Sequence, residues 1–281
     1  MFQSNPYFDT TIKVDEAAPL VANVTIEPID GLSIEPNAFN HKAKANHDDL
    51  EDLFSRIPNP EKIKVFEVSY NANLTTLPNI ERFYNLEYLY IAGRQIKDIT
   101  VVEKFPKLKS LFIVNHKKNQ LHVNDNCKLE NFRAIRGRLE TITFGADYFE
   151  LQSCSKLTNF EKIEATNVQL EDCHSLDLNT LENVSGLEKI EILGRKNLAS
   201  LNFLLGCSSV KNLVVTATDV RKTDTRALDK SKTLERCFLG QCNKKLLIEI
   251  ASQAPRLILT NGDFAYRGEE VLKVSDYYDE V

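Results

Sequence analysis

The 281-residue chain has no Trp, one Met and ten Gly, and its six Cys include no CxxC pair. A disulfide scaffold or a zinc ribbon requires closely paired cysteines, so both classes are disfavoured. Lys and Arg number 35 against 40 Asp and Glu, which gives a net charge of −5. A dedicated nucleic-acid binder normally presents a basic face, so we expect no nucleic acid as a partner. The apolar share of 42% is enough for a continuous core.

Long hydrophobic runs are also missing. The first twenty residues contain neither a basic n-region nor an unbroken apolar stretch, and no run of eighteen apolar residues occurs anywhere. The sequence therefore predicts neither a cleaved secretory signal nor a membrane span. Cytoplasmic localisation is the simplest expectation, while export without a cleaved signal stays open as an alternative.

A repeated apolar pattern is present instead. In IKVFEVSYN the apolar residues Ile63, Phe66 and Val68 are followed three positions later by Asn71, and LEYLYIAGR repeats the same offsets. The position held by Phe66 recurs at intervals of 17 to 24 residues along the chain. Its occupants are Phe66, Leu89, Leu111, Phe132, Phe149, Val168, Ile190, Leu213, Cys237 and Leu257. The alternation around this position is typical of a strand with one buried face.

From about residue 60 to 262 the pattern resembles the leucine-rich repeat family, whose unit reads LxxLxLxxN/C. The resemblance implies an α/β or mostly β solenoid of about ten repeats, with a parallel sheet on its concave face. It also implies that the Asn or Cys of each unit turns inward and hydrogen-bonds the backbone of neighbouring turns. That position holds Asn71, Cys154, Cys173 and Cys242, but also Arg94, His116, Gly137, Arg195 and Thr218. We expect the hydrogen-bonded ladder to be broken at the second group.

The two ends of a solenoid need a cover over their exposed core. Residues 1–60 are predicted to form an N-terminal arm and a cap helix, because Leu50, Leu53, Phe54 and Ile57 fall on one helical face. Within this segment, residues 1–45 form either an extra hairpin or an extended arm. The solenoid is predicted over 61–262, including a short helix in KKLLIEIASQAP, and 263–281 form a C-terminal cap and acidic tail.

The outward strand positions suggest a binding surface. Those with interface composition are Tyr88, Tyr90, Phe112, Arg133, Ile135 and Tyr148, with a second group at Arg236 and Phe238. Between them lie the acidic residues Glu150, Glu171 and Glu191, which would favour a basic partner. Aromatic residues and Arg are enriched in interface hot spots, so we favour a protein-binding surface. The alternative is cross-strand packing that stiffens an exposed sheet.

Sequence signatures of catalysis are absent: no HExxH, GxSxG, P-loop or GxGxxG occurs. Cys173 followed by His174 suggests a nucleophile, but adjacent strand residues point to opposite faces. Glu150 and Glu191 are the best pair for glycan hydrolysis. At about 4.8 Å per strand they would lie about 10 Å apart, which is outside the geometry of a retaining enzyme. We therefore expect no catalytic residues, no bound metal and no cofactor.

These observations lead to a hypothesis of a non-enzymatic protein-binding module. A chain of this charge could be an antitoxin-like immunity protein or an inhibitor of a basic protein, such as a toxin or nuclease. The expected partner is a protein, with no nucleic acid and no membrane, and the chain is expected to be a monomer. Two alternatives stay open: an exported adhesion or host-targeted effector protein, and a glycan-active repeat-fold enzyme.

Overall fold

The computed structural model describes residues 24–27, 31–34, 60–68, 77, 79–92, 98–117 and 119–274. The chain divides into two compact units, 1–138 and 139–281, and each is described by itself. The predicted cap helix, Asn71, Arg94 and the acidic tail from residue 275 lie outside the described residues.

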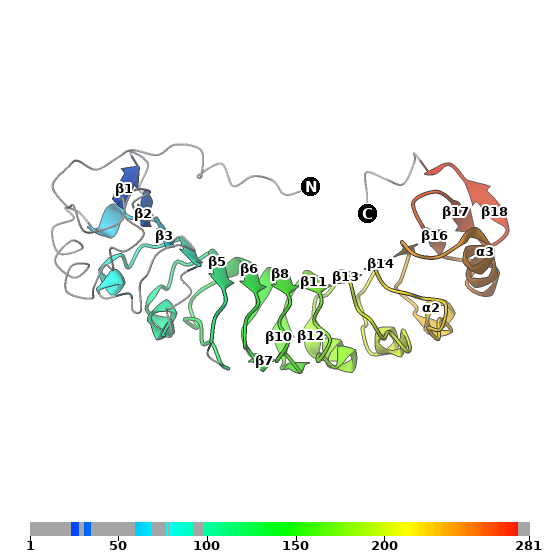
Figure 1. Ribbon diagram of the computed structural model, residues 1–281, viewed down its shortest axis with the longest axis horizontal. Coiled ribbons are helices and arrows are strands. Elements are labelled where there is room, and N and C mark those ends of the chain that lie inside the picture. The colour runs from blue at the N-terminus through cyan, green and yellow to red at the C-terminus, as the bar shows by residue number, and fades with distance from the viewer. Residues whose placement is uncertain are drawn as a thin grey trace. The chain divides into compact units, whose positions relative to one another are not determined.

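The first unit is built on parallel strands that pair in chain order (Figure 1). They are β2 (Gly31–Ile34), β3 (Val65–Val68), β4 (Tyr88–Ile91), β5 (Ser110–Val114) and β6 (Leu129–Ile135). Short 3-10 helices lie in the connections: η1 (Pro60–Lys62), η2 (Ile80–Arg82) and η3 (Thr100–Lys104). β1 (Val24–Glu27) pairs antiparallel with β2. Of the two alternatives for residues 1–45, the structure thus contains the antiparallel pair.

The second unit continues the same construction, with parallel strands that again pair in chain order (Figure 1). They are β8 (Ala146–Gln152), β11 (Asn167–Glu171), β13 (Lys189–Leu193), β14 (Asn212–Thr216), β15 (Arg236–Leu239) and β16 (Ile258–Thr260). β17 (Ala265–Arg267) and β18 (Glu270–Leu272) follow as antiparallel strands. Each unit is therefore a stretch of mostly parallel β solenoid.

The connections in the second unit are short and carry little helix. Two small parallel pairs join β7 (Thr141–Ile142) to β9 (Asn159–Phe160) and β10 (Ile163–Glu164) to β12 (Val184–Ser185). The helices are η4 (Leu178–Asn183), η5 (Asn202–Leu205), α2 (Ala227–Lys230) and α3 (Lys244–Gln253). α3 confirms the helix predicted before Pro255, and the Asn243 side chain caps it by accepting a hydrogen bond from the Leu246 amide.

The strand register agrees with the repeat pattern almost throughout. In the first unit Phe66, Leu89, Leu111 and Phe132 stand opposite one another in successive strands. In the second unit the same is true of Phe149, Val168, Ile190, Leu213 and Cys237. The prediction is wrong at the last unit, where Leu259 and not Leu257 pairs with Cys237. Both leucines are buried, and a shift of two residues leaves the same strand face inward, so the apolar pattern does not distinguish them.

The core consists of one thin layer of side chains per coil. The largest fully buried side chains are Phe66, Phe83, Phe105, Phe132, Phe149, Phe160 and Ile80. Burying a side chain of this size contributes about 1.5–3 kcal/mol relative to leaving it exposed. A coil on its own could not bury these residues on both sides, so the stability of each coil depends on its neighbours.

A left-handed residue ends the strand in coil after coil. These residues have φ between +49° and +69° and directly precede the inward-turning position of the repeat; they are Asn115, Arg136, Ser153, Asp172, Gly194 and Ala217. Their amides continue the bonding between coils past the end of the strands. In the second unit Asp172 N donates to Leu193 O at 3.0 Å, and Gly194 N donates to Thr216 O at 3.0 Å. The left-handed turn therefore directs the chain inward without interrupting the stacking.

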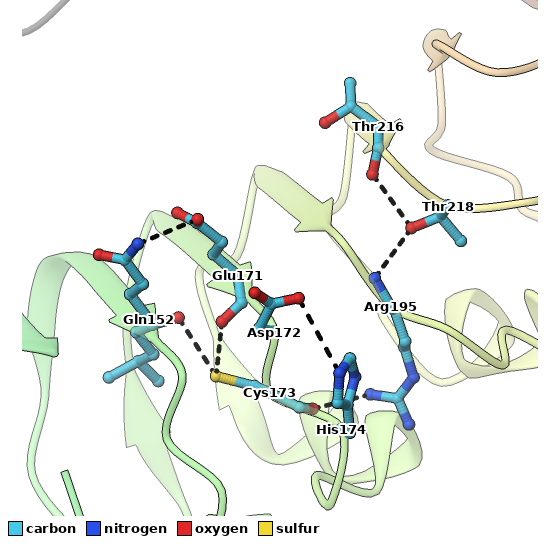
Figure 2. Close-up of polar contacts among 9 residues, drawn as sticks. Gln152, Glu171, Asp172, Cys173, His174, Arg195, Thr216 and Thr218 are labelled. Atoms are coloured by element: carbon cyan, nitrogen blue, oxygen red, sulfur yellow. Dashed lines mark hydrogen bonds and ion pairs between the residues drawn. The ribbon is translucent and has the colours of Figure 1, made fainter. Parts of the chain in front are cut away.

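The inward-turning side chains form a hydrogen-bonded ladder through several coils of the second unit (Figure 2). The Cys173 thiol donates to Leu151 O at 3.2 Å. Arg195 donates through Nη1 to Cys173 O at 3.2 Å and through Nη2 to Leu176 O at 2.9 Å. The Thr218 hydroxyl accepts from the Arg195 amide at 3.1 Å.

The expectation that the ladder breaks at Arg195 and Thr218 is therefore wrong. A ladder position needs a side chain that forms hydrogen bonds with backbone groups of the adjacent coil. Whether the side chain is long enough to form these bonds matters more than its residue type. The long Arg195 side chain extends back to the preceding turn and bonds two carbonyls there. Thr218 supplies one hydroxyl that also donates to Thr216 O at 3.0 Å.

Replacing Arg195 with Ala should destabilise the second unit. Two half-buried carbonyls would lose charged donors, and we expect the free energy of unfolding to fall by about 2 kcal/mol in urea titrations. Arg221→Ala is the matched control, because that exposed guanidinium bonds only to the neighbouring Asp219. It should change stability by less than about 0.5 kcal/mol. Equal effects of the two substitutions would contradict the ladder role.

Most of the thiols are buried and reduced. Cys154, Cys173, Cys207, Cys237 and Cys242 are buried, and Cys127 is half-buried. Burial raises the pKa of Cys207 and of Cys242 to about 11 and raises that of Cys237 further. Desolvation disfavours the thiolate in the folded state only, so the folded chain holds these protons more tightly than the unfolded chain.

Stability should therefore fall at high pH. The unfolded thiols ionise near pH 8.5–9, and the folded ones resist ionisation until about pH 11, so stability is lost as the pH rises through this interval. We expect a loss of more than about 1 kcal/mol per buried thiol between about pH 9 and about pH 11 in urea titrations. Cys207→Ala should have a shallower dependence on pH. An equally steep dependence in that variant would show that other groups cause the loss.

Candidate functional site

The first unit brings three of the predicted surface residues into one row across its sheet. Tyr90 on β4 stands opposite Phe112 on β5, and Phe112 stands opposite Arg133 on β6. The Tyr90 and Phe112 rings are 4.5 Å apart between centroids and tilted by 56°. The Arg133 guanidinium carbon lies 4.7 Å from the centroid of the Phe112 ring. We call Tyr90, Phe112 and Arg133 the aromatic row.

The contacts within the aromatic row hold its side chains in place. Tilted aromatic pairs contribute about 0.5–1.5 kcal/mol beyond their buried area, and a cation over a ring adds further attraction. All three side chains are half-buried. The cross-strand packing that was the alternative interpretation is thus present in the structure. It leaves part of each side chain accessible, so packing and binding are compatible here.

Two further predicted residues flank the aromatic row. Tyr88 lies on the same strand as Tyr90 and pairs with Ser110, and Ile135 pairs with Val114. These side chains are half-buried as well. The surface around the aromatic row therefore has both apolar and polar parts. Val114 and Ile135 are apolar, and the Ser110 hydroxyl group stands opposite Tyr88.

The outward sheet face of the second unit is polar and bonded within itself. The Tyr148 hydroxyl donates to Gln169 Oε1 at 2.6 Å. The Gln152 amide donates to Glu171 Oε1 at 3.0 Å (Figure 2). The predicted acidic residues Glu171 and Glu191 are half-buried. Both already have partners: Glu171 accepts the Gln152 bond, and Lys189 Nζ lies 3.2 Å from Glu191 Oε1. The negative charge of Glu191 is therefore in part compensated on the sheet, whereas Glu171 has a neutral amide as its partner.

Glu150 does not lie open on the surface as predicted, because its side chain is only 3% exposed. An outward strand position can be covered by side chains from neighbouring strands, which strand alternation does not reveal. Glu150 and Glu191 both pair with Gln169, from opposite sides. Two strand spacings of about 4.8 Å separate them, and this exceeds the 5–5.5 Å of retaining glycosidases. The pair therefore lacks the spacing of a retaining glycosidase.

The second predicted group lies on β15 of the second unit. Arg236 pairs with Asn212, and Phe238 pairs with Val214 and Thr260. A Cβ added at Gly240 would be 3.0 Å from Phe238 Cε1 and 3.2 Å from Thr216 Cγ2. The Phe238 ring therefore packs next to the backbone of Gly240. Phe238 belongs to the second unit, whereas the aromatic row lies on the first.

The structure gives Cys173 and His174 separate surroundings. Cys173 is buried in the ladder, whereas His174 is exposed beside Asp172, with 3.9 Å between His174 Nε2 and Asp172 Oδ1 (Figure 2). The hydrogen-bonded Cys154 thiol, and then burial, raise the pKa of Cys173. A thiol in this state is a poor nucleophile, because the thiolate is the reactive species. The ladder role therefore accounts for Cys173.

In the part of the chain that the structure describes, His, Cys, Asp and Glu form no group of three or more that could hold a metal ion. None of the helices described is both long enough and apolar enough to span a bilayer.

Comparison with known proteins gives little further information. No protein-family model matches the chain, and no curated protein matches it. Among solved structures, the chain is similar to the crystal structure of an internalin (inlF) from Listeria monocytogenes str. 4b F2365. The two are 15% identical with a TM-score of 0.37, over 77% of this chain and 70% of that chain. The solenoid fold is evident in the strand register of this chain itself.

Proposed function

We propose that this protein is a non-enzymatic binding module that recognises a protein partner through the aromatic row. The supporting observation is the alignment of Tyr90, Phe112 and Arg133 on three adjacent strands. Tyr and Arg are among the residues most enriched in interface hot spots, and hot spots cluster rather than scatter.

The sheet beneath the aromatic row favours tight binding. β5 is hydrogen-bonded to β4 on one side and to β6 on the other, so its backbone is already ordered before a partner arrives. The ring contacts also restrict the rotamers of Tyr90 and Phe112. Binding then costs less conformational entropy than it would on a mobile loop.

Tyr90→Ala and Phe112→Ala should each weaken binding to a partner recovered by affinity purification from the native host. Removing a hot-spot ring typically costs about 2 kcal/mol or more, so we expect at least about a tenfold rise in Kd by calorimetry. Tyr84→Ala is the matched control, because Tyr84 is 51% exposed and lies beside η2 rather than on the sheet face. Unchanged affinity of both row variants would refute this surface as the binding site.

We propose further that the partner is a basic protein, such as a toxin or nuclease, whose basic region the chain covers. The net charge of −5 and the carboxylates Glu171 and Glu191 on the second unit support this. The bonds that these carboxylates make on the sheet restrain their geometry. Both carboxylate side chains are half-buried. Part of each is therefore accessible to a basic partner.

The proposal of a basic partner leads to a separate prediction. Glu171→Gln and Glu191→Gln should slow association, and the association rate of the unmodified chain should fall as salt is raised, because long-range attraction steers encounter. Stopped-flow or surface plasmon resonance measurements over a salt series check this. The control is Glu249→Gln, an exposed residue on helix α3 rather than on a strand. Association that is insensitive to salt would rule out the basic partner while leaving the binding module intact.

We also propose a cytoplasmic location for the protein. An exported adhesion or effector protein could use the same aromatic row against a host protein. Fractionation of the native host separates the two: protein confined to the cell lysate supports the cytoplasmic inhibitor, and protein in the culture supernatant supports the exported alternative.

A further inference from the structure

The second unit ends in a short open edge. Among the residues that the structure describes, β18 pairs with β17 alone and stands at the end of the strand order. Val271 lies at its centre and is 70% exposed, the highest value among the exposed large hydrophobic side chains described. An open edge strand with an exposed apolar residue is a template for pairing with another strand.

The hairpin geometry determines which backbone groups face this edge. Arg267 pairs with Glu270 across a two-residue turn, and Gly268 at the first turn position has φ +58°, as the primed hairpin turns require. Hydrogen-bonded and non-hydrogen-bonded pairs alternate along an antiparallel ladder. Arg267–Glu270 closes the turn as a bonded pair, so Tyr266–Val271 is the non-bonded pair. The amide and carbonyl of Val271 therefore point away from β17, towards the open edge.

The sequence around Val271 is complementary to itself. In an antiparallel pairing of two copies centred on Val271, the two Val271 residues face each other and exchange two backbone hydrogen bonds. Glu269 of each copy, the second residue of its turn, then lies beside Lys273, which follows the strand of the other copy, and both residues are exposed. Opposite charges that face each other across strands stabilise the pairing, and the arrangement satisfies a twofold axis.

We propose that two copies of this chain associate by antiparallel pairing of their β18 strands about Val271. This dimer replaces the monomer expected from the sequence, and it is independent of the aromatic row. The interface is small, since few residues pair, and the dimer is accordingly weak and dependent on concentration. Because Glu269 and Lys273 complement each other in a pair of copies, the edge favours a second copy of this chain over an unrelated extended peptide.

Sedimentation equilibrium of the full chain over a wide concentration range tests the proposal. We expect reversible dimerisation, weakened about tenfold or more by Val271→Lys, which places two like charges on the axis. Lys273→Glu should weaken it as well, because Glu269 would then face a carboxylate. The double variant Glu269→Lys with Lys273→Glu should restore dimerisation, since the charges are exchanged but still opposite. Leu205→Lys, at an exposed site in η5, is the control and should leave association unchanged.

Hydrogen exchange provides a readout on the unmodified chain that does not depend on any variant. The Val271 amide faces solvent in the single copy and should exchange quickly at low concentration. It should become protected as concentration rises. Fast exchange at every concentration, or association that neither Val271→Lys nor Lys273→Glu weakens, would overturn the proposal.

Discussion

The in-register hydrogen bonding between successive coils is the interaction on which the rest of the structure depends. Each coil contributes one thin layer of apolar side chains, too thin to form a core alone. Pairing Phe66 with Leu89, or Val168 with Ile190, stacks these layers so that each covers the next. A coil out of register would leave both its backbone groups and its apolar layer without partners.

The same register determines what the surface can do. Because inward residues are aligned, the outward residues between them are aligned too, and Tyr90, Phe112 and Arg133 form one row. The hydrogen bonds between successive strands thus position the surface residues as well as the core residues. Its side chains are restrained by one another as well, through the ring pair and the guanidinium over Phe112. A preformed surface of this kind suits recognition of a folded partner.

The ladder of inward-turning side chains shows how much variation the register tolerates. Cys173, Arg195 and Thr218 differ in size, charge and polarity, yet all serve backbone groups of their own or neighbouring coils. What the fold requires at this position is a group that forms a hydrogen bond at the right distance. The left-handed residue before it recurs in most of these coils, held by residues as different as Arg136 and Gly194.

The sequence alone determined the strand register, because alternation places every second residue inside and the spacing of Phe66, Leu89 and Leu111 marks each coil. It also identified the members of the aromatic row. The tertiary structure decided what alternation cannot express: the shift from Leu257 to Leu259, which keeps the same face inward, and the burial of Glu150, which depends on neighbouring side chains. It also decided the left-handed turns, whose residues share no type, and the open edge at Val271, because strand pairing at the end of a sheet is not encoded in any single repeat.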